Sequence, residues 1–273
     1  MSRERVVANK RLGQNFLHDP YVIRRVVSSL ELAGTDTVLE IGCGTGALTQ
    51  HIASGPHQFI GVELDRGLFK NLCDRYRYPS ALFLNQDILQ LQISELFSAL
   101  DRPCTKVKVV GNLPYYISSP IIRWLGEQSG SIESATIMLQ AEVADRLVAL
   151  PGRKEFGVLS LLASYHFDMD KVMNVRPDAF RPIPRVSSKV LRLRPKLHPK
   201  LDLAEETALF SLIKQSFSHR RKTLLNCLKG SVNKVELEAA LVRIGHHPAS
   251  RAEALSLQDF ITLCQRLRFK DCR

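Results

Sequence analysis

The tetrapeptide Asn112-Leu113-Pro114-Tyr115 carries residue types that can act on an aromatic amine. The lone pair of an adenine N6 amine is delocalised into the ring, so this nitrogen is a poor nucleophile. The side-chain oxygen of Asn112 and the main-chain oxygen of Leu113 can each accept one N6 hydrogen, which favours a tetrahedral nitrogen and frees the lone pair for attack on a methyl group. Pro114 stiffens the turn, and Tyr115 offers a stacking face for a base swung out of its helix. The alternative is a plain loop without chemistry.

A second group of chemically suited residues is the glycine-rich string Glu40-Ile-Gly42-Cys-Gly44-Thr-Gly46-Ala47. Glycines are needed where a chain turns sharply and where a ligand approaches the backbone closely. Glu63 follows 21 residues after Gly42, at the end of the next expected strand, where a carboxylate can hold ribose hydroxyls. The string therefore predicts a cofactor that contains adenosine. Because Ala47 also completes a dinucleotide fingerprint, the glycines alone leave a nicotinamide dinucleotide open.

Asp87 adds a third candidate contact, directly after the third expected strand. A carboxylate there can accept a hydrogen bond from an adenine amine. A helix cap or a solvated acid is the structural alternative for this residue.

The elements that must position these residues alternate between short apolar strands and helical patterns. Such alternation predicts a mostly parallel sheet covered on both faces, with binding sites at the carboxyl ends of its strands. Two further strands, 171–175 and 188–193, are too close in sequence for a helical crossover and are expected to pair antiparallel. The expected strands are 38–41, 59–64, 81–84, 106–110 and 135–139, and the expected helices are 48–53, 66–76, 94–100, 120–128 and 141–150.

The pattern changes near residue 195. The stretch 194–200 is basic, rich in proline and poor in apolar residues, which is typical of a linker, and only helical patterns such as 208–217 and 256–267 follow it. We therefore expect two domains, a catalytic α/β domain over residues 1–195 and a small all-helical, basic domain over residues 196–273.

The charge is divided unevenly between these two parts. Residues 1–170 contain 17 Lys and Arg against 18 Asp and Glu, whereas residues 171–273 contain 21 against 9, so the whole excess of +11 lies in the last part. A basic block of this kind predicts a polyanion partner. Its densest cluster is Arg220-Arg221-Lys222, for which a solvated helix face is the alternative to phosphate binding.

Other features of the composition favour some classes of protein over others. No apolar run approaches the roughly 20 residues that a membrane span needs, and the start lacks the apolar core of a secretory signal. The six cysteines are scattered without a CxxC pair. We therefore expect a cytoplasmic protein with reduced thiols, no metal and no membrane contact, and nothing in the sequence demands more than a monomer.

The chain resembles the bacterial-type small-subunit rRNA adenine N6,N6-dimethyltransferases over essentially its whole length. Seven segments carry this resemblance, and they occur in the same order: 11–17 (RLGQNFL), 40–46, 63–65 (ELD), 86–87 (QD), 112–120 (NLPYYISSP), 175–188 (VRPDAFRPIPRVSS) and 217–224 (FSHRRKTL).

The resemblance implies a class I methyltransferase fold, S-adenosylmethionine as methyl donor, and two adjacent adenosines near the 3′ end of small-subunit rRNA as acceptors, each methylated twice during ribosome assembly. By position, Asn15, Leu17, Gly42, Gly44, Glu63, Asp87 and Asn112 would bind the donor, and Arg220, Arg221 and Lys222 the RNA. Tyr115 and Phe180 would enclose the target adenine, and Asn112, Leu113 and Pro114 would act on it. Without the resemblance, Phe180 would equally be a core residue.

Three other functions compete. Antibiotic-resistance methylases of large-subunit rRNA share the glycine-rich loop and a related motif, but the segment around Phe180 and the Arg220 cluster favour the small-subunit family. A non-catalytic assembly or transcription factor on the same fold conflicts with intact Asn112, Tyr115 and Glu63. A nicotinamide-dependent oxidoreductase would leave the Asn112 tetrapeptide unexplained.

Overall fold

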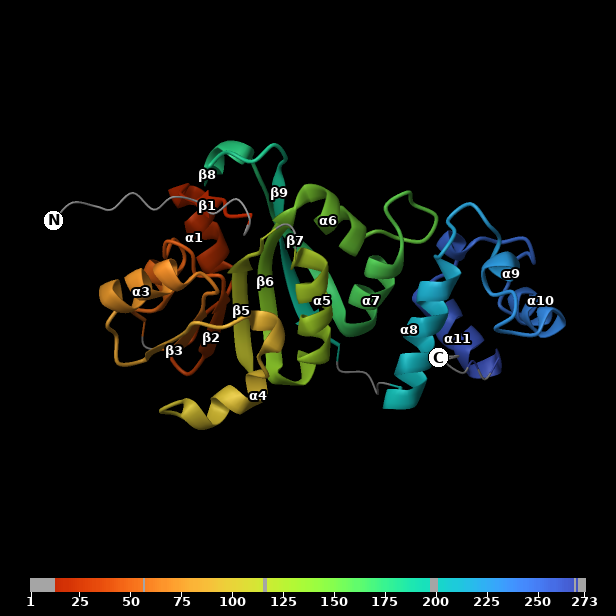
Figure 1. Cartoon of the computed structure of the whole chain (residues 1–273), viewed down its shortest axis with the longest axis horizontal. Coiled ribbons are helices and arrows are strands. Elements are labelled where there is room, and N and C mark those ends of the chain that lie inside the picture. The colour runs from red at the N-terminus through yellow and green to blue at the C-terminus, as the bar shows by residue number, and fades with distance from the viewer. Residues whose placement is uncertain (1–12, 56, 115–116, 197–200, 268, 270–273) are drawn as a thin grey trace. The chain divides into compact units, whose positions relative to one another are not determined.

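The computed structural model describes residues 13–55, 57–114, 117–196, 201–267 and 269. The chain divides into two compact units, of which the first comprises residues 1–144 and 167–195 and the second residues 145–166 and 196–273 (Figure 1). One boundary between the two units falls after residue 195, whereas the first unit also lacks residues 145–166, which the predicted domain of residues 1–195 includes. The sequence gives no sign that residues 145–166 pack with the C-terminal helices, an association that arises because Phe156 and Leu161 are buried in the core of the second unit.

A seven-stranded sheet forms the centre of the first unit, in the order β4-β3-β2-β5-β6-β9-β7. The first five of these strands run parallel, and β9 pairs antiparallel with both β6 and β7, as expected for the last two strands. Their bounds are β2 (Thr37–Ile41), β3 (Gln58–Val62), β4 (Ala81–Leu84), β5 (Val107–Asn112), β6 (Ile132–Gln140), β7 (Phe167–Val175) and β9 (Ser188–Pro195).

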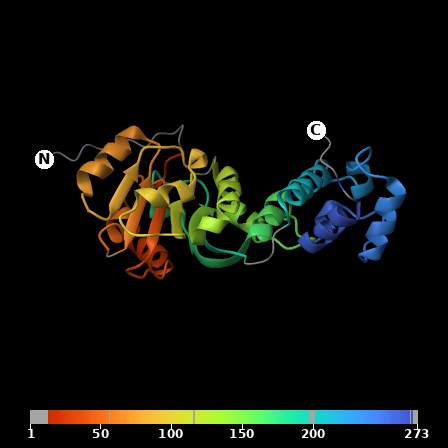
Figure 2. The same ribbon diagram turned by 90° about the horizontal axis from the view of Figure 1, so that it is seen from below.

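Helices cover both faces of this sheet. On one face α1 (Pro20–Ser28), α2 (Thr49–Ile52) and α3 (Arg66–Arg75) contribute side chains to one apolar core with β2, β3 and β5. On the other face lies α5 (Ser118–Glu127), which buries Ile121, Ile122 and Leu125; Figures 1 and 2 show it on the side opposite α1. The short helix α4 (Ile93–Leu96) also belongs to this unit, and the boundary with the second unit falls within α6 (Ala141–Leu147), after Ala144. Helix α1 begins with Asp19 as N-cap and a proline at the first helical position.

A small separate sheet joins two distant segments of the first unit. Strand β1 (Phe16–Leu17) pairs antiparallel with β8 (Phe180–Arg181). Neither strand is predicted, because two residues are too few to show a periodic pattern. The pair nevertheless fixes the N-terminal segment 13–17 beside the carboxyl ends of the parallel strands.

The second unit is helical. Its core is shared by α7 (Val158–His166), α8 (Leu203–Ser216), α10 (Lys234–Arg243) and α11 (Leu257–Leu267), with the short α9 (Leu224–Cys227) beside them. Asp202 and Glu205 form a capping box at the start of α8. Ser256 and Asp259 exchange hydrogen bonds at the start of α11.

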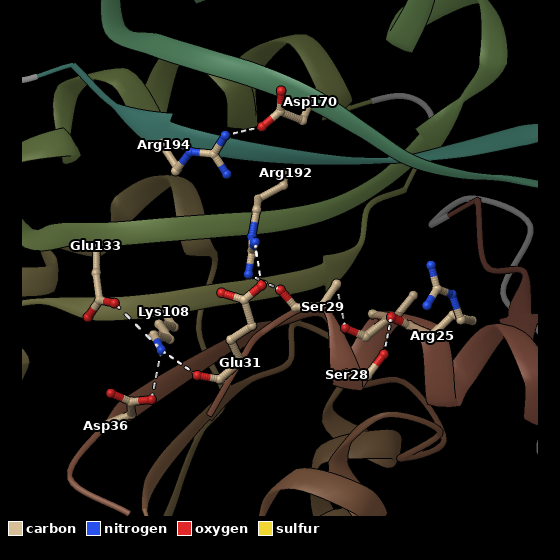
Figure 3. A network of polar contacts seen from close by, with 11 residues as sticks. Arg25, Ser28, Ser29, Glu31, Asp36, Lys108, Glu133, Asp170, Arg192 and Arg194 are labelled. Carbon is tan, nitrogen blue, oxygen red and sulfur yellow. Dashed lines mark hydrogen bonds and ion pairs between the residues drawn. The ribbon is translucent and has the colours of Figure 1, made fainter. Parts of the chain in front are cut away.

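Charged side chains form a network at the amino ends of the parallel strands (Figure 3). Lys108, near the start of β5, donates to the main-chain oxygen of Glu31 and to the Asp36 carboxylate, both at 2.9 Å, and lies 3.5 Å from the Glu133 carboxylate. Arg192 on β9 donates to the Glu31 carboxylate at 2.9 Å and to the main-chain oxygen of Ser29. The network therefore ties the segment after α1 to three strands of the sheet.

Candidate active site

The glycine-rich turn connects β2 to α2 at the carboxyl edge of the sheet. Gly42, Gly44 and Gly46 have φ angles of 70°, 57° and 84°, in the left-handed region that favours glycine. A Cβ on Gly46 would lie 2.6 Å from the Tyr76 hydroxyl, so no larger residue fits there. At Gly42, by contrast, no atom lies within 4 Å of the position of a Cβ. The backbone at Gly42 therefore faces open space, as a loop that cradles a ligand requires.

Glu63 lies directly beside this turn. Its carboxylate accepts hydrogen bonds from the main-chain N–H groups of Gly44 and Asp65, both at 2.8 Å, and the residue is only 6 % exposed. Burial raises the pKa of Glu63, although the two N–H groups act in the opposite direction. The carboxylate is thus fixed in place and poorly solvated, which makes it a strong acceptor for ligand hydroxyls.

Glu40 is a second buried acid in this cleft, and the sequence does not predict a separate role for it. It accepts a hydrogen bond from the Thr49 hydroxyl at 2.7 Å and is 2 % exposed. Burial, together with the charge of Glu63, raises the pKa of Glu40 to about 8. An acid within the otherwise apolar strand 38–41 was the signal that pointed to it. Its bond to Thr49 ties the end of β2 to the start of α2 across the glycine-rich turn.

Asp87 acts as a cap, which is the structural alternative for this residue, and it also lines the cleft. Its carboxylate accepts from the Leu89 N–H at 3.0 Å and so caps the short 3-10 turn Ile88–Gln90. A carboxylate has further acceptor capacity after one such bond. Capping therefore does not exclude a contact with a ligand amine.

Asn112 is the last residue of β5, and the turn that follows it is held on both sides. The Asn112 side-chain N–H donates to the main-chain oxygen of Asn15 at 2.9 Å. The Leu113 N–H donates to the main-chain oxygen of Met138 at 3.0 Å, and Leu113 is 1 % exposed. The main-chain oxygen of Pro114 accepts from the Ser118 hydroxyl at 3.1 Å. Tyr115 lies outside the described residues.

The N-terminal segment 13–17 closes the cleft from another side. The ring of Phe16 lies against Gly44, and Leu17 is buried. Asn15 donates from its side chain to the main-chain oxygen of Gly13 at 3.1 Å. Asn15 and Leu17 therefore lie beside the glycine-rich turn and line the cleft.

Phe180 occupies a different environment from the one that its expected role requires. It belongs to the apolar core of the first unit and has no exposed surface. This is the environment of a core residue, which is the alternative role that the sequence indicates for Phe180. A ring can stack on a base only through an exposed face. Phe180 is therefore available to an adenine only after a neighbouring side chain has moved away from it.

These residues line one cleft at the carboxyl ends of the parallel strands. Of the expected donor-binding residues, Asn15, Leu17, Gly42, Gly44, Glu63, Asp87 and Asn112 all line it. In the part of the chain that the structure describes, no group of three or more His, Cys, Asp or Glu side chains is arranged to hold a metal ion. Nor is any helix there long and apolar enough to cross a membrane.

The basic cluster of the second unit lies in the turn between α8 and α9 rather than on a helix face. Arg220, Arg221 and Lys222 are all exposed. The Arg220 guanidinium donates to the main-chain oxygens of Lys154 and Phe156, at 2.6 and 3.2 Å. Arg220 thus has an internal structural contact within its unit, which the sequence does not predict.

A mostly parallel sheet with a glycine-rich turn, an acid after the second strand and an asparagine after the fourth defines the class I methyltransferases that use S-adenosylmethionine. Residues 6–268 match the family model for ribosomal RNA adenine dimethylase. Two ribosomal RNA small subunit methyltransferase A proteins, from Bacillus mycoides and Bacillus cereus, are each 37 % identical over 264 residues, covering 94 % of this chain and 90 % of theirs. The chain therefore belongs to the ribosomal RNA adenine dimethylase family.

Solved structures agree with this assignment. The 23S rRNA methyltransferase ErmE has a TM-score of 0.71 at 28 % identity, covering 93 % of this chain and 100 % of that one. A dimethyladenosine transferase from Plasmodium falciparum has a TM-score of 0.75 at 23 % identity, covering 93 % and 99 %. These likenesses confirm the class I methyltransferase fold with a helical C-terminal part.

Proposed function

We propose that this enzyme dimethylates the N6 amines of two adjacent adenosines near the 3′ end of small-subunit rRNA, using S-adenosylmethionine, during ribosome assembly. The observation that carries the proposal is the position of Asn112 and Leu113 at the end of β5, on the wall of the cleft that Gly42 and Glu63 also line. We further propose that it works as a cytoplasmic monomer.

The cleft fits the donor chemically. The open backbone at Gly42 allows close approach of a ligand, and the fixed Glu63 carboxylate can accept from two ribose hydroxyls. Asp87 would accept from the adenine amine, and Asn15 and Leu17 would contact the methionine end. When bound, S-adenosylmethionine supplies the electrophilic methyl group.

The acceptor adenine would be positioned from the Asn112 side of the cleft. The Asn112 side-chain oxygen and the Leu113 main-chain oxygen would each accept one hydrogen of N6, which pyramidalises the nitrogen and directs its lone pair along the line of attack. Pro114 keeps this turn rigid. Tyr115 would enclose the ring together with Phe180, once a neighbouring side chain has moved away from the buried Phe180 ring. No titrating base is required, because the amine proton can leave after transfer, so most of the catalysis would come from positioning.

The basic second unit would supply affinity for the rRNA. Arg220, Arg221 and Lys222 are exposed in one turn, and phosphate contacts there would add binding that is independent of sequence.

The decisive experiment is transfer of labelled methyl groups from S-adenosylmethionine to small ribosomal subunits that lack the modification, followed by nucleoside analysis of the digested RNA. The expected result is N6,N6-dimethyladenosine at about four methyl groups per subunit, which follows from two acceptors with two exchangeable N6 hydrogens each. Label on large-subunit RNA instead would identify a resistance-type methylase. Tight RNA binding without any transfer would identify an assembly factor that has lost the reaction.

A further inference from the structure

The side-chain amide of Asn112 has only one of its two orientations available. Its neighbour at 2.9 Å is the main-chain oxygen of Asn15, 97 residues away in the sequence. A carbonyl oxygen can only accept a hydrogen bond, so the atom that faces it must be the amide nitrogen. The amide oxygen of Asn112 therefore points the other way. No donor from the described residues lies on that oxygen, and Asn112 lines the cleft.

The Asn15 carbonyl can impose this orientation because the segment that carries it is itself fixed. Phe16 and Leu17 pair with Arg181 and Phe180, and the His18 N–H donates to the main-chain oxygen of Ala179 at 2.9 Å. On the other side, the Phe16 ring packs on Gly44, and the Asn15 side chain bonds back to Gly13. The carbonyl is thus anchored to both the glycine-rich turn and the segment around Phe180.

We infer that the main-chain carbonyl of Asn15 is a positioning group for methyl transfer, which holds Asn112 with its oxygen toward the acceptor amine. The inference rests on the proposed function. A flipped amide would present its NH₂ group to the NH₂ group of adenine, two donors facing each other, and would bring its oxygen against the Asn15 oxygen. Both contacts are unfavourable, so a freely rotating Asn112 would spend part of its time in a form that cannot activate the amine.

The substitution Asn112→Asp tests this inference through its dependence on pH. An ionised aspartate has no hydrogen to donate to the Asn15 oxygen, whereas a protonated one can donate its O–H there and turn its carbonyl oxygen to the amine. Transfer by the variant, divided by transfer by the natural enzyme, should therefore rise about tenfold for each unit by which the pH falls, over roughly pH 8.5 to 5.5, while it stays above the pKa of the new carboxyl. Dividing by the natural enzyme removes the titration of the other acids and the histidine around the cleft, which are Glu40, Glu63, Asp65, Asp87 and His18.

Two results with the aspartate variant would overturn the inference. A ratio that does not change with pH would overturn the inference, because a carboxylate would then work without the bond to Asn15. Inactivity of the folded variant at every pH would also overturn it, since the neutral acid reproduces both the donor and the acceptor of the amide. The control is Asn112→Ala, which should be inactive throughout the pH range. If the natural enzyme itself transfers nothing to rRNA, the proposed function fails instead.

A second measurement examines the hydrogen bond without any reaction, in case the aspartate variant does not fold. The side-chain NH₂ resonances of Asn112 in the natural protein can be assigned by comparison with the spectrum of Asn112→Ala. One of the two protons should exchange with water at least about tenfold more slowly than those of an exposed asparagine side chain, because it is held by the Asn15 oxygen. Fast exchange of both protons would contradict the inference.

Discussion

Carboxyl groups at the two edges of the central sheet lie in opposite environments. At the carboxyl edge, Glu40 and Glu63 are buried, and no Lys or Arg of the described residues forms an ion pair with either of them. Burial raises the pKa of both carboxyls, that of Glu40 to about 8. At the amino edge, the hydrogen bond and charge of Arg192 lower the pKa of the exposed Glu31. Burial acts to raise the pKa of Asp36 there, but the Ala33 N–H and Lys108 outweigh it and the pKa is lowered.

The difference shows which edge stabilises the fold and which one serves a ligand. Lys108 behaves as its partners do: burial acts to lower its pKa, but the bond to Asp36 and the charge of Glu133 outweigh it and the pKa is raised. The charged groups of the amino edge are thus paired within the protein. The carboxyl edge keeps poorly solvated acids with raised pKa values, which is typical of functional sites.

The largest effect should come from removing the acceptor at the carboxyl edge. Asn112→Ala deletes one of the two oxygens proposed to activate the amine, and we expect methyl transfer to fall by on the order of 10³-fold. RNA binding should remain nearly unchanged, because no phosphate contact is removed. Single-turnover transfer and a filter-binding assay measure the two quantities. Loss of RNA binding together with activity would mean that Asn112 serves the structure of the site rather than the chemistry.

At the amino edge the corresponding substitution should affect stability instead. Lys108→Met leaves the partly buried carboxylate of Asp36 without its cation, and we expect the free energy of unfolding to fall by about 2 kcal/mol. Activity per folded molecule should be retained. Urea denaturation gives the free energy, and the matched control is Lys106→Met, which removes the same charge from an exposed position two residues earlier. Equal effects of the two substitutions would remove the distinction between the edges.

The dependence of stability on pH should separate the edges further. A carboxyl whose pKa is raised by folding contributes stability that is fully present below its unfolded value and is lost as the pH rises through the folded value. For Glu40 this window runs from 4.5 to about 8. Asp36 and Glu31, whose pKa values are lowered, contribute stability above their unfolded values of 3.8 and 4.5 that is lost as the pH falls.

Glu40→Gln isolates the first of these contributions, because glutamine stays neutral and can still accept from Thr49. The variant should match the natural protein near pH 5 and exceed its free energy of unfolding by roughly 2–4 kcal/mol above pH 8. Urea denaturation at several pH values measures the difference. If the difference does not change with pH, Glu40 does not carry this dependence.

Glu63→Ala should weaken donor binding by about thirtyfold, or about 2 kcal/mol, because the ribose hydroxyls would lose a charged acceptor. Calorimetric titration with S-adenosylmethionine measures the dissociation constant. Glu63→Gln keeps one acceptor oxygen, so its dissociation constant should lie between those of the natural protein and of Glu63→Ala. An unchanged constant in the alanine variant would exclude the ribose role.

The sequence predicts the parts of this molecule that local patterns encode. The five parallel strands, the antiparallel pair and the acids at strand ends follow from periodicity and the geometry of parallel sheets. The family and the S-adenosylmethionine chemistry were carried by short motifs such as 40–46 and 112–115.

What the sequence does not predict depends on long-range packing. The pairing of β1 with β8 and the bond from Asn112 to Asn15 join segments far apart in the chain. The helix α7 lies in a segment without clear helical alternation, and only its burial among the C-terminal helices places it in the second unit. The burial of Phe180 and the raised pKa of Glu40 likewise arise from neighbours that no local pattern identifies.

The smallest expected effect is a change in rRNA binding, and it compares two neighbouring arginines of the second unit, Arg220 and Arg221. The Arg220 guanidinium donates hydrogen bonds to the Lys154 and Phe156 carbonyls, whereas no side-chain hydrogen bond or ion pair holds Arg221 among the described residues. Arg221→Ala should therefore weaken rRNA binding only about threefold, but make the slope of log K against log salt less negative by about 0.7–0.9, the loss of one phosphate contact. Arg220→Ala should in addition lower the midpoint of thermal unfolding, because the segment around residues 154–156 loses its bonds. If Arg221→Ala leaves the slope unchanged while Arg220→Ala reduces it, the phosphate contact belongs to Arg220 despite its internal bonds.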